Sequence, residues 1–314
     1  MKYTTLGKTG LRVSVVGLGG IPIQRTDVEG TRKVVDACVE TGINYIDTAR
    51  GYTVSEEYLG EVLEGRRDKF ILATKTMARD YAGMKADIEK SLHNLRTNYI
   101  DLYQIHNIKS DAEFETCFGE NGAYKALLEA KAEGKIGHIG ATAHGVEALE
   151  RLITEFEDKI ETVMFPYNIV ENQGESLMQK CKEKNIAFIA MKPLAGGNIE
   201  DATLAMKYIL QNPNCTIAIP GMGDAEEVYQ NAAAADMGGT VNEPVPVQNL
   251  AVYGHVFALL DNENVADLHF VKRDFFFFPF AFHGNGIRHE FYEFFNFFAR
   301  FPLGFFFQPF TQGN

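Results

Sequence analysis

Eight short apolar segments lie along the first 240 residues of the chain, and each is followed by a stretch with amphipathic helical spacing. The segments are apolar throughout, which is typical of strands buried on both faces of a parallel sheet. Eight such strand–helix units predict an α/β fold, a closed (β/α)8 TIM barrel, which typically takes about 250 residues. The predicted strands are residues 13–20, 43–46, 70–75, 99–106, 136–142, 162–168, 186–193 and 215–221. The predicted helices are residues 28–40, 56–63, 84–95, 123–132, 146–156, 175–184, 204–210 and 224–235.

A hairpin precedes these units, and the end of the first strand helps to distinguish a closed barrel from an open sheet. Residues 3–13 predict a β-hairpin that turns at Lys8-Thr9-Gly10. An open, doubly wound sheet is the alternative to the barrel, and it usually carries GxGxxG after its first strand. Here the strand ends in GLGG, without the third glycine, which favours the barrel. We therefore expect a barrel over residues 1–240 and a C-terminal extension over residues 241–314.

The composition excludes several classes of protein. The formal net charge of −12 argues against nucleic-acid binding, because phosphates need a basic face. The N-terminus has no apolar signal segment and the chain has no run of about twenty apolar residues, so we expect a cytoplasmic protein without a membrane span. The four cysteines are far apart and form no CxxC pair, which predicts a reducing compartment and no structural metal. They are Cys38, Cys117, Cys181 and Cys215.

Four ionisable side chains lie at or just after the ends of consecutive predicted strands. Asp47, Lys75 and His106 end the second, third and fourth strands, and Tyr52 follows in the loop after the second. In a (β/α)8 barrel these strand ends meet at one rim, where active sites lie. Each residue alone has an ordinary structural interpretation, as a solvated or hydrogen-bonded side chain. Four together at one rim are harder to explain that way, because burying unpaired charge is costly.

The four side chains make chemical sense as a group. A tyrosine hydroxyl has a pKa of about 10, and a neighbouring ammonium group favours the phenolate and lowers that pKa. An aspartate beside the lysine keeps the lysine charged and in place. A histidine can hold the oxygen of a bound carbonyl. The group therefore predicts a proton donor and an oxygen clamp for carbonyl reduction, provided that a hydride donor lies alongside.

The motifs around these residues resemble those of the aldo-keto reductases. The resemblance covers about residues 3–236 and implies a reductase that uses NADH or NADPH on aldehydes or ketones. It implies that Tyr52 protonates the carbonyl oxygen, that Lys75, held by Asp47, lowers the pKa of Tyr52, and that His106 orients the carbonyl. The matching segments are TTLGKTGLRVS, GLG, NYIDTARGY, SEEYLGEVL, FILATKT, YIDLYQIH, GKIGHIGAT, PYN and AIPGM.

The family's nicotinamide-binding positions are only partly kept. The usual Ser-Asn after the fifth strand is Thr142-Ala143 here, and the usual Gln before the Tyr-Asn pair is Met164. Thr142 and Asn168 retain side chains that can hydrogen-bond a carboxamide. Ala143 and Met164 do not, and His144 is the adjacent candidate to replace them.

Two glycine-containing loops are expected to bind the cofactor phosphates. They follow the seventh and eighth strands, and glycine lets backbone amides approach a pyrophosphate closely. Taken alone, the same glycines would be ordinary turn residues. The residues expected to contact the cofactor here are Pro193, Leu194, Gly196, Gly197, Gly221 and Gly223.

The last predicted helix bears on the choice between NADH and NADPH. A 2′-phosphate needs Arg or Lys, and neither occurs between Lys207 and Lys272. Asp224 would repel a 2′-phosphate but could accept a hydrogen bond from a ribose 2′-hydroxyl, with Glu227 and Asn231 left for the adenine. The alternative is that Asp224 only caps the helix. We expect use of NADH or of both cofactors.

The segment after residue 240 shows no pattern that predicts helices or strands. It holds sixteen of the 24 phenylalanines, between residues 275 and 310, with no period that would bury one face. A cap over the barrel, an oligomer interface, membrane contact and a shifted reading frame are the alternatives. Some relatives carry an iron–sulfur tail, but no cysteine follows Cys215, so no cluster is expected. A second functional hypothesis is a nucleotide-sensing accessory subunit that docks a partner through this tail.

Overall fold

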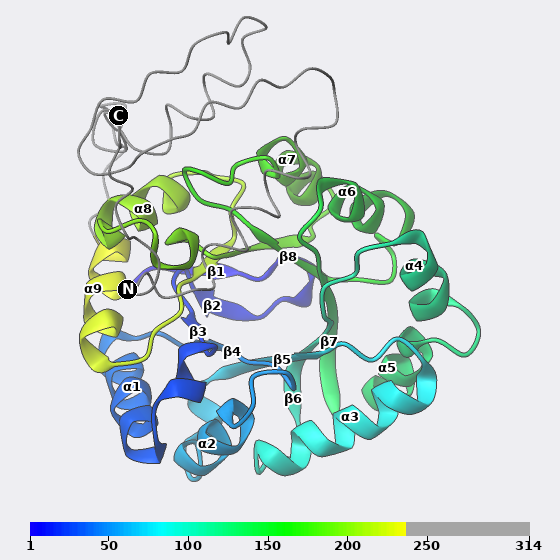
Figure 1. Ribbon diagram of the computed structural model, residues 1–314, viewed down its shortest axis with the longest axis horizontal. Helices are drawn as coiled ribbons and strands as arrows, with labels where there is room; N and C mark the ends of the chain where they lie inside the picture. Colours follow the sequence, from blue (N-terminus) through cyan, green and yellow to red (C-terminus); the bar gives the residue numbers. More distant parts are fainter. Residues whose placement is uncertain (237–314) are drawn as a thin grey trace, which may run out of the picture. The chain divides into compact units, whose positions relative to one another are not determined.

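Eight parallel strands form the wall of a barrel in the computed structural model, which describes residues 1–236 (Figure 1). They are hydrogen-bonded in chain order from β3 to β10, so every neighbour along the wall is also the next strand in sequence. The strands are β3 (Leu18–Gly19), β4 (Tyr45–Asp47), β5 (Ile71–Thr76), β6 (Ile100–Ile105), β7 (Ile136–Thr142), β8 (Thr162–Pro166), β9 (Ala187–Met191) and β10 (Ile217–Ile219).

Backbone contacts between the first and last strand segments close the wall. Gly17 N donates to Ala218 O over 2.9 Å, and Gly19 N donates to Pro220 O over 2.8 Å. A parallel bridge joins Val16 to Ala218 in the same seam. The predicted (β/α)8 barrel is therefore confirmed, and the open sheet is excluded. The first strand is shorter than predicted because residues 13 and 14 belong to the hairpin.

Nine α-helices in residues 1–236 surround the strands (Figure 1). Helix α4 was not predicted, and the other eight lie within a few residues of their predicted bounds. Side-chain caps set the starts of some of them, as at Asp27, whose carboxylate accepts from Gly30 N over 2.7 Å. The helices are α1 (Val28–Thr41), α2 (Ser55–Val62), α3 (Tyr81–Asn94), α4 (Asp111–Phe118), α5 (Ala123–Ala132), α6 (Val146–Glu155), α7 (Glu175–Glu183), α8 (Ala202–Leu210) and α9 (Ala225–Asp236).

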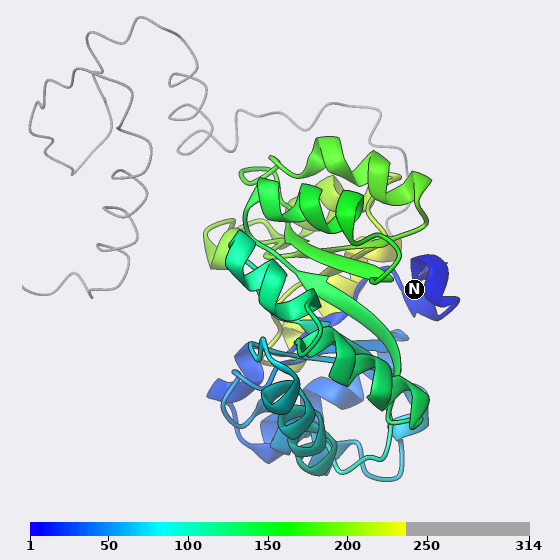
Figure 2. The same ribbon diagram turned by 90° about the vertical axis from the view of Figure 1, so that its right-hand side faces the viewer.

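The predicted N-terminal hairpin, β1 (Tyr3–Thr5) and β2 (Arg12–Ser14), covers one end of the barrel, which Figure 2 shows from the side. Leu6 is fully buried among side chains of the barrel interior. Lys8 N donates to Asn185 O, just before β9, over 2.8 Å. A Cβ added to Gly7 would lie 2.6 Å from the backbone nitrogen of Ala187, so this close approach requires glycine. The hairpin thus closes the end where the strands begin.

The strand pleat sorts side chains into layers inside the barrel. Alternate residues of a strand point to the same face, so positions two apart stack along the interior. An apolar layer contains Tyr45, Ala73 and Leu102. The residues two positions further on are Asp47, Lys75 and Gln104, all buried. The barrel therefore presents a polar layer toward the carboxyl ends of its strands, above an apolar floor.

Several expectations fall on residues 237–314 and lie outside the described residues. These are the extension over 241–314, its roles as cap, interface or docking tail, and its lack of an iron–sulfur cluster. Within residues 1–236, no helix combines the length and apolar character needed to cross a bilayer. The same part of the chain has no cluster of three His, Cys, Asp or Glu side chains arranged to hold a metal ion.

Candidate active site

A buried ion pair lies at the centre of the polar layer. Lys75 Nζ donates to Asp47 Oδ1 and, over 2.8 Å, to Thr48 O. The second carboxylate oxygen of Asp47 accepts from Gln104 Nε2 over 3.2 Å. Gln104 was not among the predicted residues. Its position two residues before His106, on the same face of β6, is the signal that would have found it.

Burial and pairing act against each other on both charges. Burial tends to lower the pKa of Lys75, but Asp47 and Tyr52 outweigh that effect, and the pKa is raised above its ordinary value. Burial raises the pKa of Asp47, although Lys75 and Gln104 hold it down in part. The lysine therefore stays an ammonium group throughout the neutral range.

Tyr52 lies directly beside this ammonium group. Lys75 Nζ is 4.9 Å from the centroid of the Tyr52 ring. Burial raises the pKa of the Tyr52 hydroxyl, and Lys75 lowers it only in part. Lys75 therefore acts on the pKa in the expected direction, but the net shift is upward. The reason is desolvation, which disfavours a buried phenolate more than the lysine favours it.

His106 completes the group from the end of β6. Its ring packs edge-on against Tyr52, with the centroids 6.1 Å apart and the planes at 85°. Burial, followed by the charges of Lys75, His144 and Arg79, lowers the pKa of His106 to about 3. The imidazole is therefore neutral near pH 7. The structure thus brings Asp47, Tyr52, Lys75 and His106 into one cluster, whose catalytic roles remain predictions.

The positions expected to hold the nicotinamide differ in how their side chains are used. Thr142 is buried, and its hydroxyl accepts from Asn107 N over 2.7 Å, which leaves its own proton to donate. Asn168 is fully buried within its loop, where its amide oxygen accepts from Val170 N and Glu171 N at 2.8 Å. Its amide nitrogen donates to Glu171 Oε2 over 3.0 Å and to Lys192 O over 2.9 Å. Asn168 therefore organises the rim loops, whereas Thr142 presents a donor.

The loop after β9 has the backbone conformation of a glycine turn. Gly196 and Gly197 have φ values of 72° and 97°, in the left-handed region that glycine adopts readily. Pro193 is buried and Leu194 is half-buried at its start. A Cβ on Gly221, in the loop after β10, would lie 3.0 Å from a side-chain carbon of Pro22. Both loops follow the carboxyl ends of strands and flank the same rim.

The start of α9 is occupied by its own carboxylates. Asp224 Oδ1 accepts from Glu227 N over 2.9 Å, so Asp224 does cap the helix. Glu227 Oε2 in turn accepts from Gly223 N over 2.6 Å. Asn231 donates its amide nitrogen to Glu227 O over 2.8 Å, while its buried amide oxygen has no partner among the described residues. The positive end of this helix is therefore already matched with negative charge.

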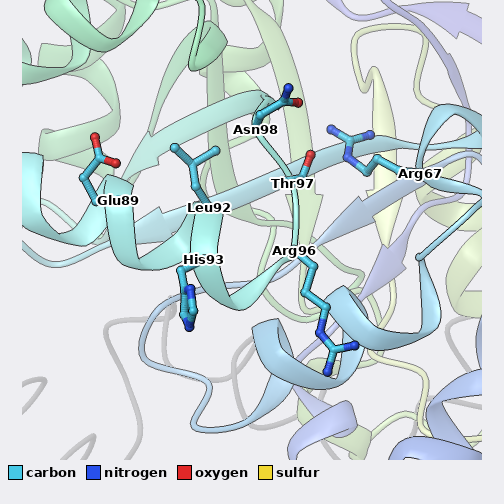
Figure 3. Close-up of a pocket in the computed structure, with 7 residues that line it drawn as sticks. All are labelled: Arg67, Glu89, Leu92, His93, Arg96, Thr97 and Asn98. Atoms are coloured by element: carbon cyan, nitrogen blue, oxygen red, sulfur yellow. The ribbon is translucent and has the colours of Figure 1, made fainter.

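A shallow, open surface pocket of about 790 Å³ lies away from this rim (Figure 3). Its residues come from the C-terminal part of α3 and from the turns that precede β5 and β6. It therefore opens where the strands begin, the end of a (β/α)8 barrel that contributes stability, not catalysis. Its lining residues are Arg67, Glu89, Leu92, His93, Arg96, Thr97 and Asn98.

A closed (β/α)8 barrel with a polar cluster at the carboxyl ends of its strands is the architecture of a large class of enzymes. A sequence model of the aldo/keto reductase family matches residues 15–203. The chain therefore belongs to the aldo/keto reductase family, a family of oxidoreductases.

Individual relatives agree with this assignment. The uncharacterised oxidoreductase YqkF of Bacillus subtilis is 27% identical over 249 residues, which cover 74% of this chain and 78% of the relative. The aldo-keto reductase YhdN of the same organism is 32% identical over 224 residues, 63% of each chain. A crystal structure of an aldo/keto reductase from Klebsiella pneumoniae, in complex with NADP and acetate, matches with a TM-score of 0.67 and 25% identity. That match covers 80% of this chain and 95% of the other.

Proposed function

We propose that the protein is an NAD(P)H-dependent reductase that converts small aldehydes or ketones to alcohols. One observation carries the proposal: a buried ammonium group, Lys75, lies between the carboxylate of Asp47 and the ring of Tyr52, next to His106. A tyrosine that is protonated at neutral pH and backed by a fixed positive charge is suited to donate a proton to an oxygen that gains negative charge.

The rim contains groups that suit a nicotinamide cofactor. The buried amide oxygen of Asn231 lacks a partner among the described residues and could accept from the amino group of an adenine. The left-handed glycines at Gly196 and Gly197 leave room for a pyrophosphate to approach the backbone. Thr142 retains a hydroxyl proton for a carboxamide oxygen. A bound NADP in the Klebsiella relative supports the same assignment.

The reduced nicotinamide would supply the hydride, and the chain's own residues would do the rest. Neutral His106 would donate a hydrogen bond to the carbonyl oxygen and orient it. Tyr52 would then transfer its proton to that oxygen as the hydride reaches the carbon, so that the carbonyl becomes an alcohol. Lys75 would stabilise the phenolate that remains on Tyr52 until solvent returns the proton. Asp47 and Gln104 would hold Lys75 in place.

Tyr52→Phe tests this function directly. The variant keeps the ring but loses the proton donor, so we expect kcat for a reactive aldehyde to fall by about 100-fold or more. Cofactor affinity, measured by the fluorescence of bound NADH or NADPH, should stay within about threefold of the wild type, because the hydroxyl is proposed to act on the substrate. Tyr58→Phe, the same change on the adjacent helix α2, is the matched control and should leave kcat unchanged. Full activity in Tyr52→Phe would refute the proposed role.

A further inference from the structure

The turn between β4 and α2, residues 48–54, carries Tyr52 and has no regular secondary structure. Its first half lies along β5, where Arg50 N donates to Lys75 O over 2.9 Å. Tyr52 N then donates back to Ala49 O over 3.0 Å. Thr53 has a φ of 42°, a left-handed conformation that is unfavourable for a residue with a Cβ. The position of the Tyr52 hydroxyl therefore depends on what holds the two ends of this turn.

A buried ion pair joins those two ends. Arg50, two residues before Tyr52, donates from Nη1 to Glu56 Oε2 over 2.6 Å. Glu56 lies in the first turn of α2, four residues after Tyr52, and its side chain is 1% exposed. Asp87, on α3, lies 3.8 Å from Arg50 Nε and gives the guanidinium a second negative neighbour. This ion pair therefore connects the residues that precede Tyr52 with those that follow it.

Glu56 is also fixed to the outer surface of the barrel wall. Thr74, next to Lys75 on β5, and Ser91 on α3 each donate a hydroxyl to Glu56 Oε1 over 2.8 Å. Asn94 donates to Oε2 over 3.4 Å. Together with Arg50 these groups use all of the carboxylate's acceptor capacity, about four sites. The network thus connects the Tyr52 turn to the strand that carries Lys75.

A buried ion pair is by itself weak evidence of a stabilising role. Replacing a buried ion pair by well-packed apolar residues is often neutral or stabilising, so such pairs are poor stabilising devices. The charge-assisted contact between a guanidinium and a carboxylate is directional, so it favours one arrangement of the residues that carry it. The reaction requires such an arrangement, because displacing a reacting group by about 1 Å costs about 100-fold in rate.

We propose that Arg50 and Glu56 are positioning residues that fix the Tyr52 turn against β5 and so set the position of the Tyr52 hydroxyl over Lys75. Neither residue touches the substrate in this scheme. The inference rests on the proposed function, since it concerns the alignment of the proton donor. It predicts that breaking the pair slows the chemical step more than it weakens cofactor binding.

Glu56→Gln is the informative variant, because it preserves shape but removes the negative charge that holds Arg50. We expect kcat for a test aldehyde to fall by about 10- to 100-fold while KM for the cofactor changes by less than about threefold. The primary deuterium isotope effect on kcat, measured with cofactor deuterated at nicotinamide C4, should rise as hydride transfer becomes rate-limiting. Arg50→Lys keeps the positive charge but changes the geometry of the pair. Its kcat should therefore lie between that of Glu56→Gln and that of the wild type.

Asp101→Asn is the matched control for a purely structural role. Asp101 is likewise a buried carboxylate paired with an arginine, since its Oδ2 accepts from Arg67 Nη2 over 2.6 Å and from Leu72 N over 2.9 Å. It lies at the opposite end of the strands, so this variant should lose stability but keep kcat and the isotope effect.

The outcomes separate the inference from the function on which it rests. Wild-type kcat in Glu56→Gln, or an equal loss of kcat in Asp101→Asn, would overturn the positioning role while leaving carbonyl reduction intact. If Glu56→Gln does not fold, Arg50→Lys decides: a lowered kcat with unchanged cofactor KM supports the role, and an unchanged kcat overturns it. Failure of the wild type to reduce any carbonyl in a broad panel would overturn the proposed function, and this inference with it.

Discussion

At the scale of single residues, the environment of Tyr52 decides which protonation state the site offers. Burial raises the pKa of its hydroxyl, Lys75 opposes that rise, and the hydroxyl stays protonated in the neutral range. A reductase needs this state, because the tyrosine must hold a proton when the carbonyl oxygen becomes basic. In the proposed mechanism, Lys75 therefore stabilises the phenolate after proton transfer and does not generate it beforehand.

The pH dependence of reduction follows from these shifts. Since the pKa of Tyr52 is raised from an ordinary value of about 10, the proton donor is lost only as the pH rises above that value. Since the pKa of His106 is lowered to about 3, the imidazole gains a proton only in strong acid. We therefore expect kcat/KM for aldehyde reduction to be nearly constant from about pH 6 to about pH 9.

The measurement is kcat/KM at constant ionic strength, because the pH profile of this ratio reports ionisations of the free enzyme. An inflection near pH 6.5 that disappears in His106→Gln would contradict a neutral, desolvated imidazole. An inflection at the same pH that persists in His106→Gln would belong to another group.

The sequence predicts some members of this cluster and misses others for a physical reason. Asp47, Lys75 and His106 could be found because a parallel barrel brings all carboxyl strand ends to one rim. The ion pair of Arg50 and Glu56 could not be predicted, because it depends on side-chain conformations between the barrel wall and helices α2 and α3. The net pKa shift of Tyr52 could not be predicted either, since its sign depends on how deeply the hydroxyl is buried.

At the scale of elements, the starts of several helices are set by capping residues that can be found in the sequence. Helix α4 was missed although Ser110 and Glu113 form a capping pattern, in which Glu113 N donates to Ser110 Oγ over 3.4 Å. Helix α3 begins earlier than predicted because Asp80 caps it, accepting from Gly83 N over 2.9 Å. Apolar periodicity alone finds the buried middle of a helix, and caps define its ends.

The N-terminus of α9 bears on the choice of cofactor. The carboxylates of Asp224 and Glu227 already accept from the backbone amides of Glu227 and Gly223, so a 2′-phosphate would meet negative charge at a place that often binds anions. We therefore propose that the wild type uses NADH, or both cofactors. A preference for NADPH of 100-fold or more in kcat/KM, about 2.7 kcal/mol, would contradict this interpretation.

Asp224→Ser separates the charge of this residue from its capping role. Serine is a good N-cap, so α9 should keep its start while losing one negative charge. We expect the ratio of kcat/KM for NADPH to that for NADH to rise about 5- to 10-fold, equivalent to about 1 kcal/mol. Asp80→Ser, the same change at the cap of α3, should leave the ratio unchanged. An unchanged ratio in Asp224→Ser would show that its carboxylate lies too far from the ribose to matter.

At the scale of the described barrel, residues 1–236, the closing hairpin and the candidate active site lie at opposite ends. The hairpin closes the end where strands begin, and the polar cluster occupies the end where they finish. Between them lies the apolar layer of Tyr45, Ala73 and Leu102. This arrangement lets residues at one end change with little effect on the other, provided that the wall stays intact.

Leu6→Ala tests this separation, because Leu6 is fully buried beneath the apolar layer. Removing its side chain leaves a cavity, so the free energy of unfolding should fall by about 2 to 5 kcal/mol. Urea unfolding followed by circular dichroism is suitable, since the chain has no Trp. Leu128→Ala, the same change at a leucine that is 46% exposed, should alter stability by about 0.5 kcal/mol or less.

Both variants should keep kcat within about twofold of the wild type at 25 °C, because neither contacts Lys75 or the Tyr52 turn. A large loss of kcat in folded Leu6→Ala would mean that the hairpin also positions the polar layer through the barrel interior.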